Sequence, residues 1–388
     1  MKEQSKKALR FIQVRMENWR NFLATDVQLQ SRAFLVGPNA SGKSNFLDVF
    51  RFLHDIVAVG GGFQQAVIKR GGVSRLRCLS ARRYPDVVIH VQLGNNGQSP
   101  QWQYELHFSQ DNRQRPVVKK EKITRQGSIL FDRPLEEDKK DPERLTQTYL
   151  QQMNVNQEFR DIADFFESVH YLHIVPQLVR EPNRSLGQKN DPYGGDFLEQ
   201  VARTPEKTQK ARLRRIGNAL SVAVPQLVKI ELIRDPATGV PHLRGKYEHW
   251  RPRGAWQQED QFSDGTLRLM GLLWAALDGS GPLLLEEPEL SLHPEVVRVL
   301  PQVFARIQRR LNRQILISTH SSDLLRDDGI GLDETLLLQP SRNGTMVRSA
   351  DNSEEIKQLL NGGLTIAEAV IPMTRPKEAE QLLLFGDL

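Results

Sequence analysis

The segment Gly37-Pro38-Asn39-Ala40-Ser41-Gly42-Lys43-Ser44 limits the possible folds of this chain more than any other, because it matches the pattern G-x-x-x-x-G-K-[ST] in full. It follows a predicted strand, Ala33–Val36, and opens a segment whose apolar residues recur with helical spacing. Glycines allow backbone N–H groups to turn inward around phosphate oxygens, in conformations that a side chain would hinder. The sequence therefore predicts a P-loop between a strand and a helix.

The residue types of this P-loop predict what it binds. We expect Lys43 to place its charge near the β- and γ-phosphates of ATP, and the Ser44 hydroxyl to reach Mg²⁺. The N-terminus of the following helix adds a favourable dipole. The predicted nucleotide-binding residues of this segment are Gly37, Pro38, Asn39, Ala40, Ser41, Gly42, Lys43, Ser44 and Asn45.

The order of the other predicted elements indicates a nucleotide core in two pieces. Alternating apolar residues predict strands at Phe11–Met16, Thr25–Leu29, Asp86–Leu93, Trp102–Phe108, Val117–Thr124, Leu227–Arg234 and His242–Glu248. Residues 133–179 are expected to be mostly helical, and residues 204–222 to form a basic amphipathic helix. After Ser263 the pattern alternates between helix Thr266–Leu277, strand Pro282–Glu286, helix Pro294–Arg310 and strand Gln314–Ser318. Such alternation predicts a parallel sheet with crossover helices.

Carboxylates follow the apolar strand Pro282–Glu286. This strand would deliver Glu286 to the water shell of the magnesium ion, and Glu287 is placed to polarise the attacking water. Glu289 has two interpretations, a site residue or a solvated loop charge. The next predicted strand ends before His320, which is a candidate hydrogen-bond partner of the γ-phosphate.

Four segments together resemble one family. Gln261-Phe262-Ser263-Asp264-Gly265-Thr266-Leu267-Arg268 resembles the signature of ABC-type ATPases, as found in RecF-like, SMC-like and OLD-family proteins. The segment from Glu286 to Pro294 is similar to their Walker B motif and D-loop, and His320 to their switch histidine. The segment Glu17–Phe22 is similar to the element that precedes their P-loop strand. The similarity is tight over residues 9–58 and 260–325.

This resemblance implies an α/β fold, a two-lobed ABC-type P-loop NTPase head with a split nucleotide core and an inserted α+β lobe. It implies ATP hydrolysis in a head-to-head homodimer or larger assembly, with Ser263 and Gly265 of one copy completing the site of the other. Arg268 would either orient the signature helix or lie on the surface. The expected divisions are an N-terminal ATPase lobe (9–125), an inserted region (126–260), a C-terminal ATPase lobe (261–350) and a tail (351–388).

The sequence departs from the wider family at several positions. Glu286 stands where aspartate is more usual, and Asp264 stands where transporter ATPases commonly have glycine. The glutamine that links the magnesium site to the inserted region is not identified, although Gln64 and Gln65 lie in a plausible part of the chain.

The resemblance also suggests a biological setting. OLD-family nucleases carry a TOPRIM domain after the ATPase, and no Asp-x-Asp pair of that domain follows His320 here. The chain is therefore similar to stand-alone ATPases of prokaryotic anti-phage defence systems, which act with a separately encoded TOPRIM- or HNH-type effector nuclease. Two alternatives are a RecF-like DNA-repair ATPase that clamps DNA, and an ATP-bound scaffold with negligible turnover.

Charge and composition bear on partners and location. The formal net charge of the chain is +6, and basic residues outnumber acidic ones between Arg203 and Arg253, which is the stretch expected to contact DNA phosphates in a clamp. Apolar runs are strand-sized and the N-terminus lacks the apolar core of a signal peptide, so we expect a cytoplasmic protein with no membrane segment. The single cysteine, Cys78, is expected to be a small buried residue.

Overall fold

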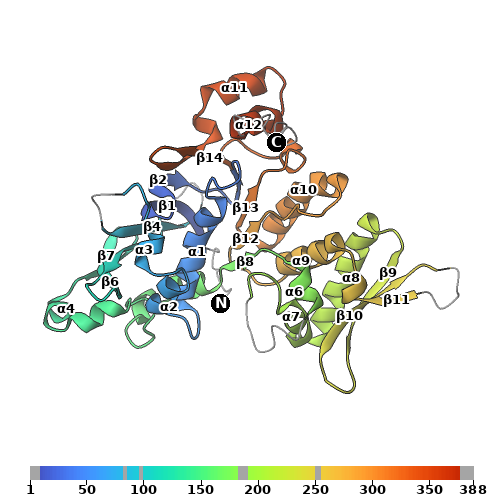
Figure 1. Cartoon of the computed structure of the whole chain (residues 1–388), viewed down its shortest axis with the longest axis horizontal. Helices are drawn as coiled ribbons and strands as arrows, with labels where there is room; N and C mark the ends of the chain where they lie inside the picture. Colours follow the sequence, from blue (N-terminus) through green and yellow to red (C-terminus); the bar gives the residue numbers. More distant parts are fainter. Residues whose placement is uncertain (1–8, 82–84, 96–98, 182–190, 250–254, 376–388) are drawn as a thin grey trace, which may run out of the picture.

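The computed structural model describes residues 9–81, 85–95, 99–181, 191–249 and 255–375. These residues form two six-stranded sheets and one three-stranded sheet, with helices between them (Figure 1). The central sheet takes its strands from both halves of the chain, which confirms the expected α/β fold with a split nucleotide core.

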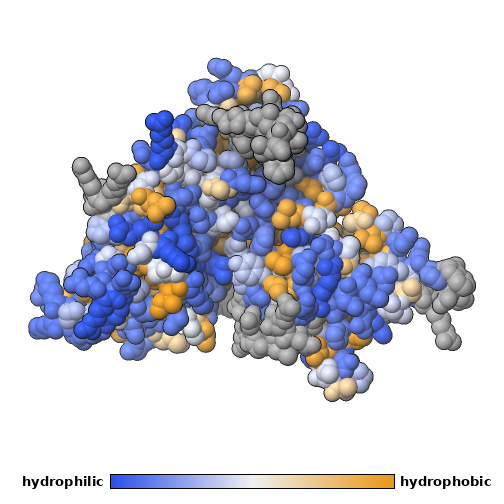
Figure 2. Space-filling model, in the orientation of Figure 1, coloured by the Kyte–Doolittle hydropathy of each residue, from blue (hydrophilic) through white to orange (hydrophobic). Residues whose placement is uncertain are grey.

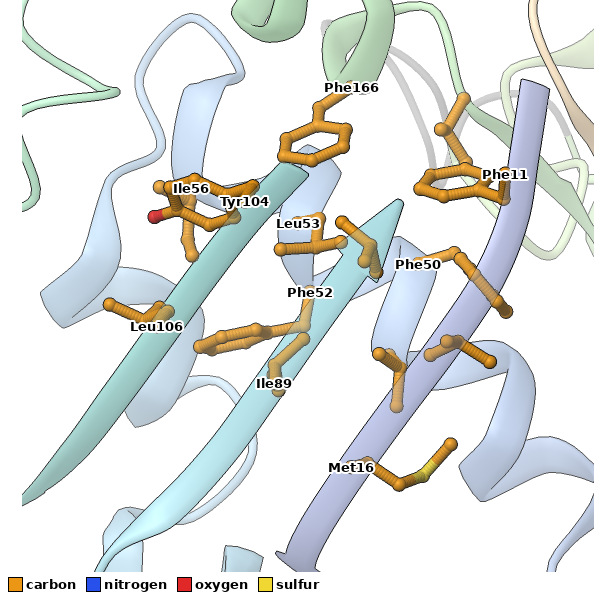
Figure 3. Close-up of a cluster of buried hydrophobic side chains, with 14 of the residues drawn as sticks. Phe11, Met16, Phe50, Phe52, Leu53, Ile56, Ile89, Tyr104, Leu106 and Phe166 are labelled. Atoms are coloured by element: carbon orange, nitrogen blue, oxygen red, sulfur yellow. The ribbon is translucent and has the colours of Figure 1, made fainter. Parts of the chain in front are cut away.

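The N-terminal sheet is antiparallel, with the strand order β2-β1-β4-β5-β6-β7. Its strands are β1 (Arg10–Trp19), β2 (Phe22–Gln28), β4 (Val87–Gly94), β5 (Trp102–Gln110), β6 (Pro116–Arg125) and β7 (Ser128–Arg133). Every second residue of β4 and β5 is buried, which agrees with the alternation in the sequence. Helix α1 (Lys43–Val57) covers the apolar face, and Figure 3 shows Phe52 of α1 beside Ile89 and Leu106 of this sheet.

The central sheet has the strand order β15-β14-β3-β13-β12-β8. Its strands are β15 (Gly344–Ser349), β14 (Thr335–Ser341), β3 (Arg32–Val36), β13 (Ile315–Thr319), β12 (Leu283–Glu286) and β8 (His170–Leu172). All neighbours pair in parallel except β14 and β15. Because parallel strands end at one edge, the residues that follow β3, β12, β13 and β8 meet there.

Strand alternation in the central sheet separates two hydrophobic cores. In β3, Ala33 and Leu35 face the core under the N-terminal sheet, whereas Phe34 and Val36 face the core formed with the C-terminal helices. The strand is buried on both faces, as parallel strands covered on both sides are. A shift of one residue in the pairing of this strand would exchange the residues on its two faces. The register of β3 therefore also sets the position of the P-loop that follows it.

The third sheet is antiparallel, with the order β11-β10-β9. It consists of β9 (Leu227–Arg234), β10 (Pro241–Tyr247) and β11 (Ala255–Gln258), and it packs with α7 (Phe197–Arg203), α8 (Glu206–Ala223) and α9 (Asp264–Leu277). The predicted helix at 204–222 and the strands at 227–234 and 242–248 are confirmed. Figure 1 shows this lobe at the opposite end of the molecule from β7.

The expectation that residues 133–179 are mostly helical is wrong in part. This stretch contains the helices α4 (Glu136–Lys140), α5 (Arg160–Glu167) and α6 (Pro176–Arg180), but also β8, which extends the central sheet beside β12. β8 has three residues, too few for an alternating pattern to reveal. Residues 126–260 thus contribute to all three sheets, through β7, β8 and the strands β9, β10 and β11.

The remaining helices lie around these sheets. They are α2 (Phe63–Ile68), α3 (Val73–Leu76), α10 (Pro294–Leu311), α11 (Glu354–Asn361) and α12 (Ile366–Thr374). Cys78 is buried, as expected. The face shown in Figure 2 is largely hydrophilic with small apolar patches. In the described part of the chain, no helix combines the length and the apolar character that crossing a membrane requires.

Candidate nucleotide site

The P-loop joins strand β3 to helix α1, as the sequence predicted. Gly42 has a φ angle of 96°, and a Cβ atom there would lie 2.1 Å from the side-chain nitrogen of Asn21. A Cβ atom at Gly37 would lie 2.5 Å from Ser41 Oγ and 2.7 Å from the carbonyl oxygen of Leu338. A side chain at either glycine would therefore displace the loop.

Asn21 supports the P-loop from the segment Glu17–Phe22. Its Nδ2 donates to the carbonyl oxygen of Ser41 at 2.9 Å, and its Oδ1 accepts from Asn45 Nδ2 at 2.8 Å. Thr345 Oγ1 donates to the same Ser41 carbonyl at 2.8 Å. The family resemblance identified this segment, but only the structure shows that Asn21 fixes the shape of the phosphate-binding turn.

Lys43 is a buried cation beside the P-loop. Lys43 is only 6% exposed. Its Nζ donates to the carbonyl oxygens of Gly37 at 2.9 Å and Pro38 at 3.2 Å. Burial lowers the pKa of the ammonium group, and the carboxylate of Glu287 opposes that shift. Within the described residues its hydrogen-bond partners are carbonyl oxygens rather than a carboxylate, so its charge suits an anionic ligand.

Ser44 and Glu286 meet next to the P-loop. Ser44 Oγ donates to one carboxylate oxygen of Glu286, and the hydroxyl of Tyr171 donates to the other. Burial, together with the negative charge of Glu286, raises the pKa of Tyr171. A hydroxyl and a carboxylate are the hard oxygen ligands that Mg²⁺ takes alongside phosphate oxygens, so the residues present fit a Mg·ATP complex.

The residue that follows β12 contacts the residue that follows β13. Glu287 has a positive φ angle of 44°, and its N–H donates to the carbonyl oxygen of Ser318 at 3.0 Å. Its carboxylate lies 3.3 Å from His320 Nδ1. A left-handed conformation in a non-glycine residue costs about 1–3 kcal/mol and is retained where the surrounding structure holds it. The predicted base and the predicted switch histidine are therefore in direct contact.

The interpretation of Glu289 as a solvated loop charge is wrong. Glu289 is 7% exposed, and its Oε1 accepts from Thr319 Oγ1 at 2.6 Å and from the His320 N–H at 3.4 Å. Among the described residues its Oε2 is buried without a hydrogen-bond partner. Burial raises the pKa of this carboxyl group. Glu289 thus links the Walker B turn to the backbone of the switch histidine.

The signature residues lie at the start of α9. Ser263 is exposed and caps the helix, with its Oγ accepting from the Thr266 N–H at 3.1 Å. A Cβ atom at Gly265 would lie 2.5 Å from the carbonyl oxygen of Ser291, so glycine is required by close packing within one chain. No hydrogen bond of the described residues joins Ser263 to the P-loop of its own chain.

Two arginines accompany the signature. Arg180 Nη2 donates to the Phe262 carbonyl oxygen at 2.7 Å and forms an ion pair with Asp264 at 2.6 Å, an interaction that would be lost with glycine at position 264. Arg268 is half-buried, and its Nε has no hydrogen-bond partner in the part of the chain that the structure describes. Both interpretations of Arg268 therefore stay predictions.

The residues beside Glu286 come from β8 rather than from α2. Gln64 Nε2 donates to the carbonyl oxygens of Pro116 at 2.7 Å and Thr146 at 2.8 Å, and its helix α2 packs against α1 and β6 in the N-terminal lobe. His173 follows β8, and its Nδ1 lies 3.3 Å from the carbonyl oxygen of Glu286. A groove of 410 Å³ beside Ser44 and Glu286 is lined by Tyr171 and His173. Because β8 has only three residues, no pattern in the sequence pointed to Tyr171 and His173.

The comparisons with known proteins agree with this geometry. Residues 32–327 match the family described as "AAA domain, putative AbiEii toxin, Type IV TA system". No curated protein matches the chain significantly.

Solved structures with the same fold include an SMC head bound to the C-terminal winged-helix domain of ScpA. It is 12% identical to this chain with a TM-score of 0.53, and the alignment covers 90% of this chain and 99% of that one. A second structure is an SMC head with an extended coiled coil, bound to the C-terminal domain of ScpA derived from Pyrococcus furiosus. It is 10% identical with a TM-score of 0.52, and the alignment covers 91% of this chain and 100% of that one. The fold is therefore that of an SMC-type head, an ABC-type P-loop NTPase.

Proposed function

The chain belongs to this family of AAA domains, and from that premise we propose that it hydrolyses ATP in a site completed by a second copy of the same head. Its family is described as an AAA domain, and its fold is that of an ABC-type P-loop NTPase head. The observation that carries the proposal is the meeting, at one sheet edge, of the P-loop, the Ser44–Glu286 pair and the Glu287–His320 pair.

Each of these groups has a part in the reaction. The buried Lys43 binds phosphate oxygens and offsets charge that develops on them. Mg²⁺, held by Ser44 and Glu286, would supply further neutralisation of the phosphates. Glu287 orients and polarises the attacking water, and His320 contacts the γ-phosphate while its contact with Glu287 orients that carboxylate.

A second copy supplies what one chain does not. Ser263 lies exposed at the N-terminus of α9, where N–H groups and the helix dipole favour an anion. In a two-fold dimer the exposed helix tip of each copy would face the P-loop of the other, which gives two equivalent sites.

Mixing two inactive variants tests this arrangement. Lys43→Ala damages the P-loop side and Ser263→Ala the signature side, so a mixed dimer contains one site with neither change. Random exchange makes half of all dimers mixed, each with one of two sites intact, so an equimolar mixture should recover about a quarter of the wild-type rate. No recovery, or full activity of the Ser263→Ala variant alone, would overturn the paired site.

We further infer an ATPase component of a prokaryotic anti-phage system with a separately encoded effector nuclease of the TOPRIM or HNH type. The family description names a putative AbiEii toxin of a type IV toxin–antitoxin system, which by its name has a second component. Co-purification from the native host, with and without ATP, tests this role: recovery of a nuclease-type protein with the wild type but not with Lys43→Ala supports it, and recovery of the ATPase alone contradicts it.

A DNA clamp is the second candidate function, with one correction to the predicted contact residues. Arg212 forms an ion pair with Asp278 at 2.7 Å and stacks over Trp274, so it stabilises the lobe. Arg214 and Arg215 lie exposed on α8, which keeps the candidate open. The predicted contacts Arg251 and Arg253 lie outside the described residues. Duplex binding that weakens steeply with salt and with Arg214→Ala would favour the clamp.

A further inference from the structure

Among the described residues, only one of the two faces of the three-stranded sheet packs on the hydrophobic core. Leu227, Ile230 and Leu243 point into the core shared with α9, and α8 packs beside them. Figure 1 shows the sheet at the end of the molecule, beyond α8 and α9. On the other face, Lys246 of β10 lies opposite Lys229 of β9 on one side and opposite Trp256 of β11 on the other.

Trp256 is the centre of this face. Trp256 is 41% exposed, whereas tryptophan side chains are on average highly buried. The guanidinium carbon of Arg244 lies 4.4 Å from the indole centroid and Lys229 Nζ lies 6.0 Å from it. These cation–π contacts hold the ring on the sheet while part of it remains open to solvent.

The charge of this face is positive. This face carries three cations, Lys229, Arg244 and Lys246. Among the described residues, the carboxylate that pairs with two of them is that of Glu231, which lies 2.5 Å from both Lys229 and Arg244. Lys246 has no ion pair among the described residues, and it stands directly across from Lys229. Like charges in cross-strand pairs repel each other, so this arrangement does not serve the stability of the sheet itself. A bound anion would remove the repulsion.

We propose that this face, defined as Lys229, Arg244, Lys246 and Trp256 and called the tryptophan face, binds single-stranded nucleic acid. An exposed indole flanked by cations offers a stacking surface for one base and contacts for the phosphates on either side of it. A single strand fits better than a duplex, because bases that are paired and stacked within a helix do not present a face to the indole. This surface is independent of the proposed ATP site.

Anisotropy of a fluorescently labelled oligothymidylate, titrated with the full chain over a series of salt concentrations, tests the proposal. Trp256→Ala should weaken binding about 10-fold or more, since base–aromatic stacking is lost, and should leave the salt dependence nearly unchanged. Trp256→Phe retains a ring and should bind within a few-fold of the wild type. Lys229→Ala with Lys246→Ala should lower the slope of log K against log salt by about 1.4, at about 0.7 for each phosphate contact.

Arg309→Ala with Arg310→Ala is the matched control. It likewise removes two positive charges, from exposed positions of α10, which is not part of this sheet. The control should leave affinity and salt slope close to the wild type. Equal loss in both double variants, unchanged binding by Trp256→Ala, or preference for duplex over single strand would overturn the proposal. An oligouridylate of the same length then distinguishes RNA from DNA as the source of the strand. ATP turnover should be unchanged in all of these variants.

Discussion

The P-loop side and the signature side of the head differ in how far one chain completes them. On the P-loop side, the hydrogen-bond partners of the buried Lys43 are carbonyl oxygens among the described residues, and two carboxylates with their own partners stand at the same edge of the central sheet. On the signature side, Ser263 is exposed and its hydroxyl is already used to cap its own helix. The P-loop side therefore suits an anionic ligand within one chain. The signature side is a capped helix N-terminus, and in the proposed dimer its ligand would be the ATP bound by the other copy. Under the proposed paired site, ATP would bind on the P-loop side of one copy, and turnover would need the signature side of another.

The largest effect is expected on the P-loop side. Lys43→Ala should reduce phosphate release about 100-fold or more, because a charge placed for the transition state is lost. The melting temperature should be unchanged or higher, since a desolvated cation is removed. Lys357→Ala is the control, because this lysine of α11 pairs with the exposed carboxylates of Asp351 and Glu354. Full activity of Lys43→Ala would refute the assignment of the site.

Glu287→Gln should separate the steps that the comparison distinguishes. The amide cannot accept a proton, so turnover should fall about 100-fold or more while ATP binding is kept, and ATP-bound pairs should accumulate in light scattering. Glu295→Gln is a matched control in an exposed carboxylate of α10 that pairs with Arg298. A scaffold with negligible turnover predicts instead that Glu287→Gln changes neither rate nor assembly.

Ser263→Ala should affect pairing more than binding. The α9 cap is lost, which costs about 1 kcal/mol of stability, and the affinity of one head for ATP should stay unchanged. ATP-dependent dimerisation should weaken, as measured by sedimentation over a protein concentration series. Ser353→Ala removes an equivalent cap, at α11 in the C-terminal part, and should cost similar stability without affecting dimerisation. Equal effects of both variants on dimerisation would contradict a special role for the signature.

The smallest effect concerns pH and Glu289. Its pKa is raised by burial above the ordinary 4.5, so the folded state binds this proton more tightly than the unfolded state. The associated stability is present below pH 4.5 and is lost as pH rises toward the folded-state pKa. Glu289→Gln keeps the Oε1 acceptor for Thr319 and removes the titration, so its unfolding free energy should exceed that of the wild type at neutral pH, and the difference should shrink as pH falls toward 4.5. Denaturant unfolding at several pH values measures both unfolding free energies. A difference between Glu289→Gln and the wild type that does not change with pH would contradict this prediction.

Much of the site was predictable because local patterns carry it. The strand before the P-loop, its glycines and the strand–helix alternation after Ser263 each express a backbone requirement within a short window, and the structure agrees with them. The contacts of the supporting residues were not predictable, although the resemblance identified the segment that contains Asn21. Asn21, Tyr171 and His173 contact the site from elements far away in the chain, and β8 is too short to show a period.

The sequence by itself determined the chemistry of the phosphate cradle and the identities of the carboxylates, since those depend on residue type and spacing. Only the tertiary structure decided which of these carboxylates is buried, because burial depends on what packs from elsewhere. Glu289 shows the difference: its neighbours in sequence suggest a polar loop, whereas Thr319 and His320, from another strand, enclose it. In the same way, cross-strand pairing alone brought Trp256 next to Lys246, because hydrogen-bond register is set between strands and not along them.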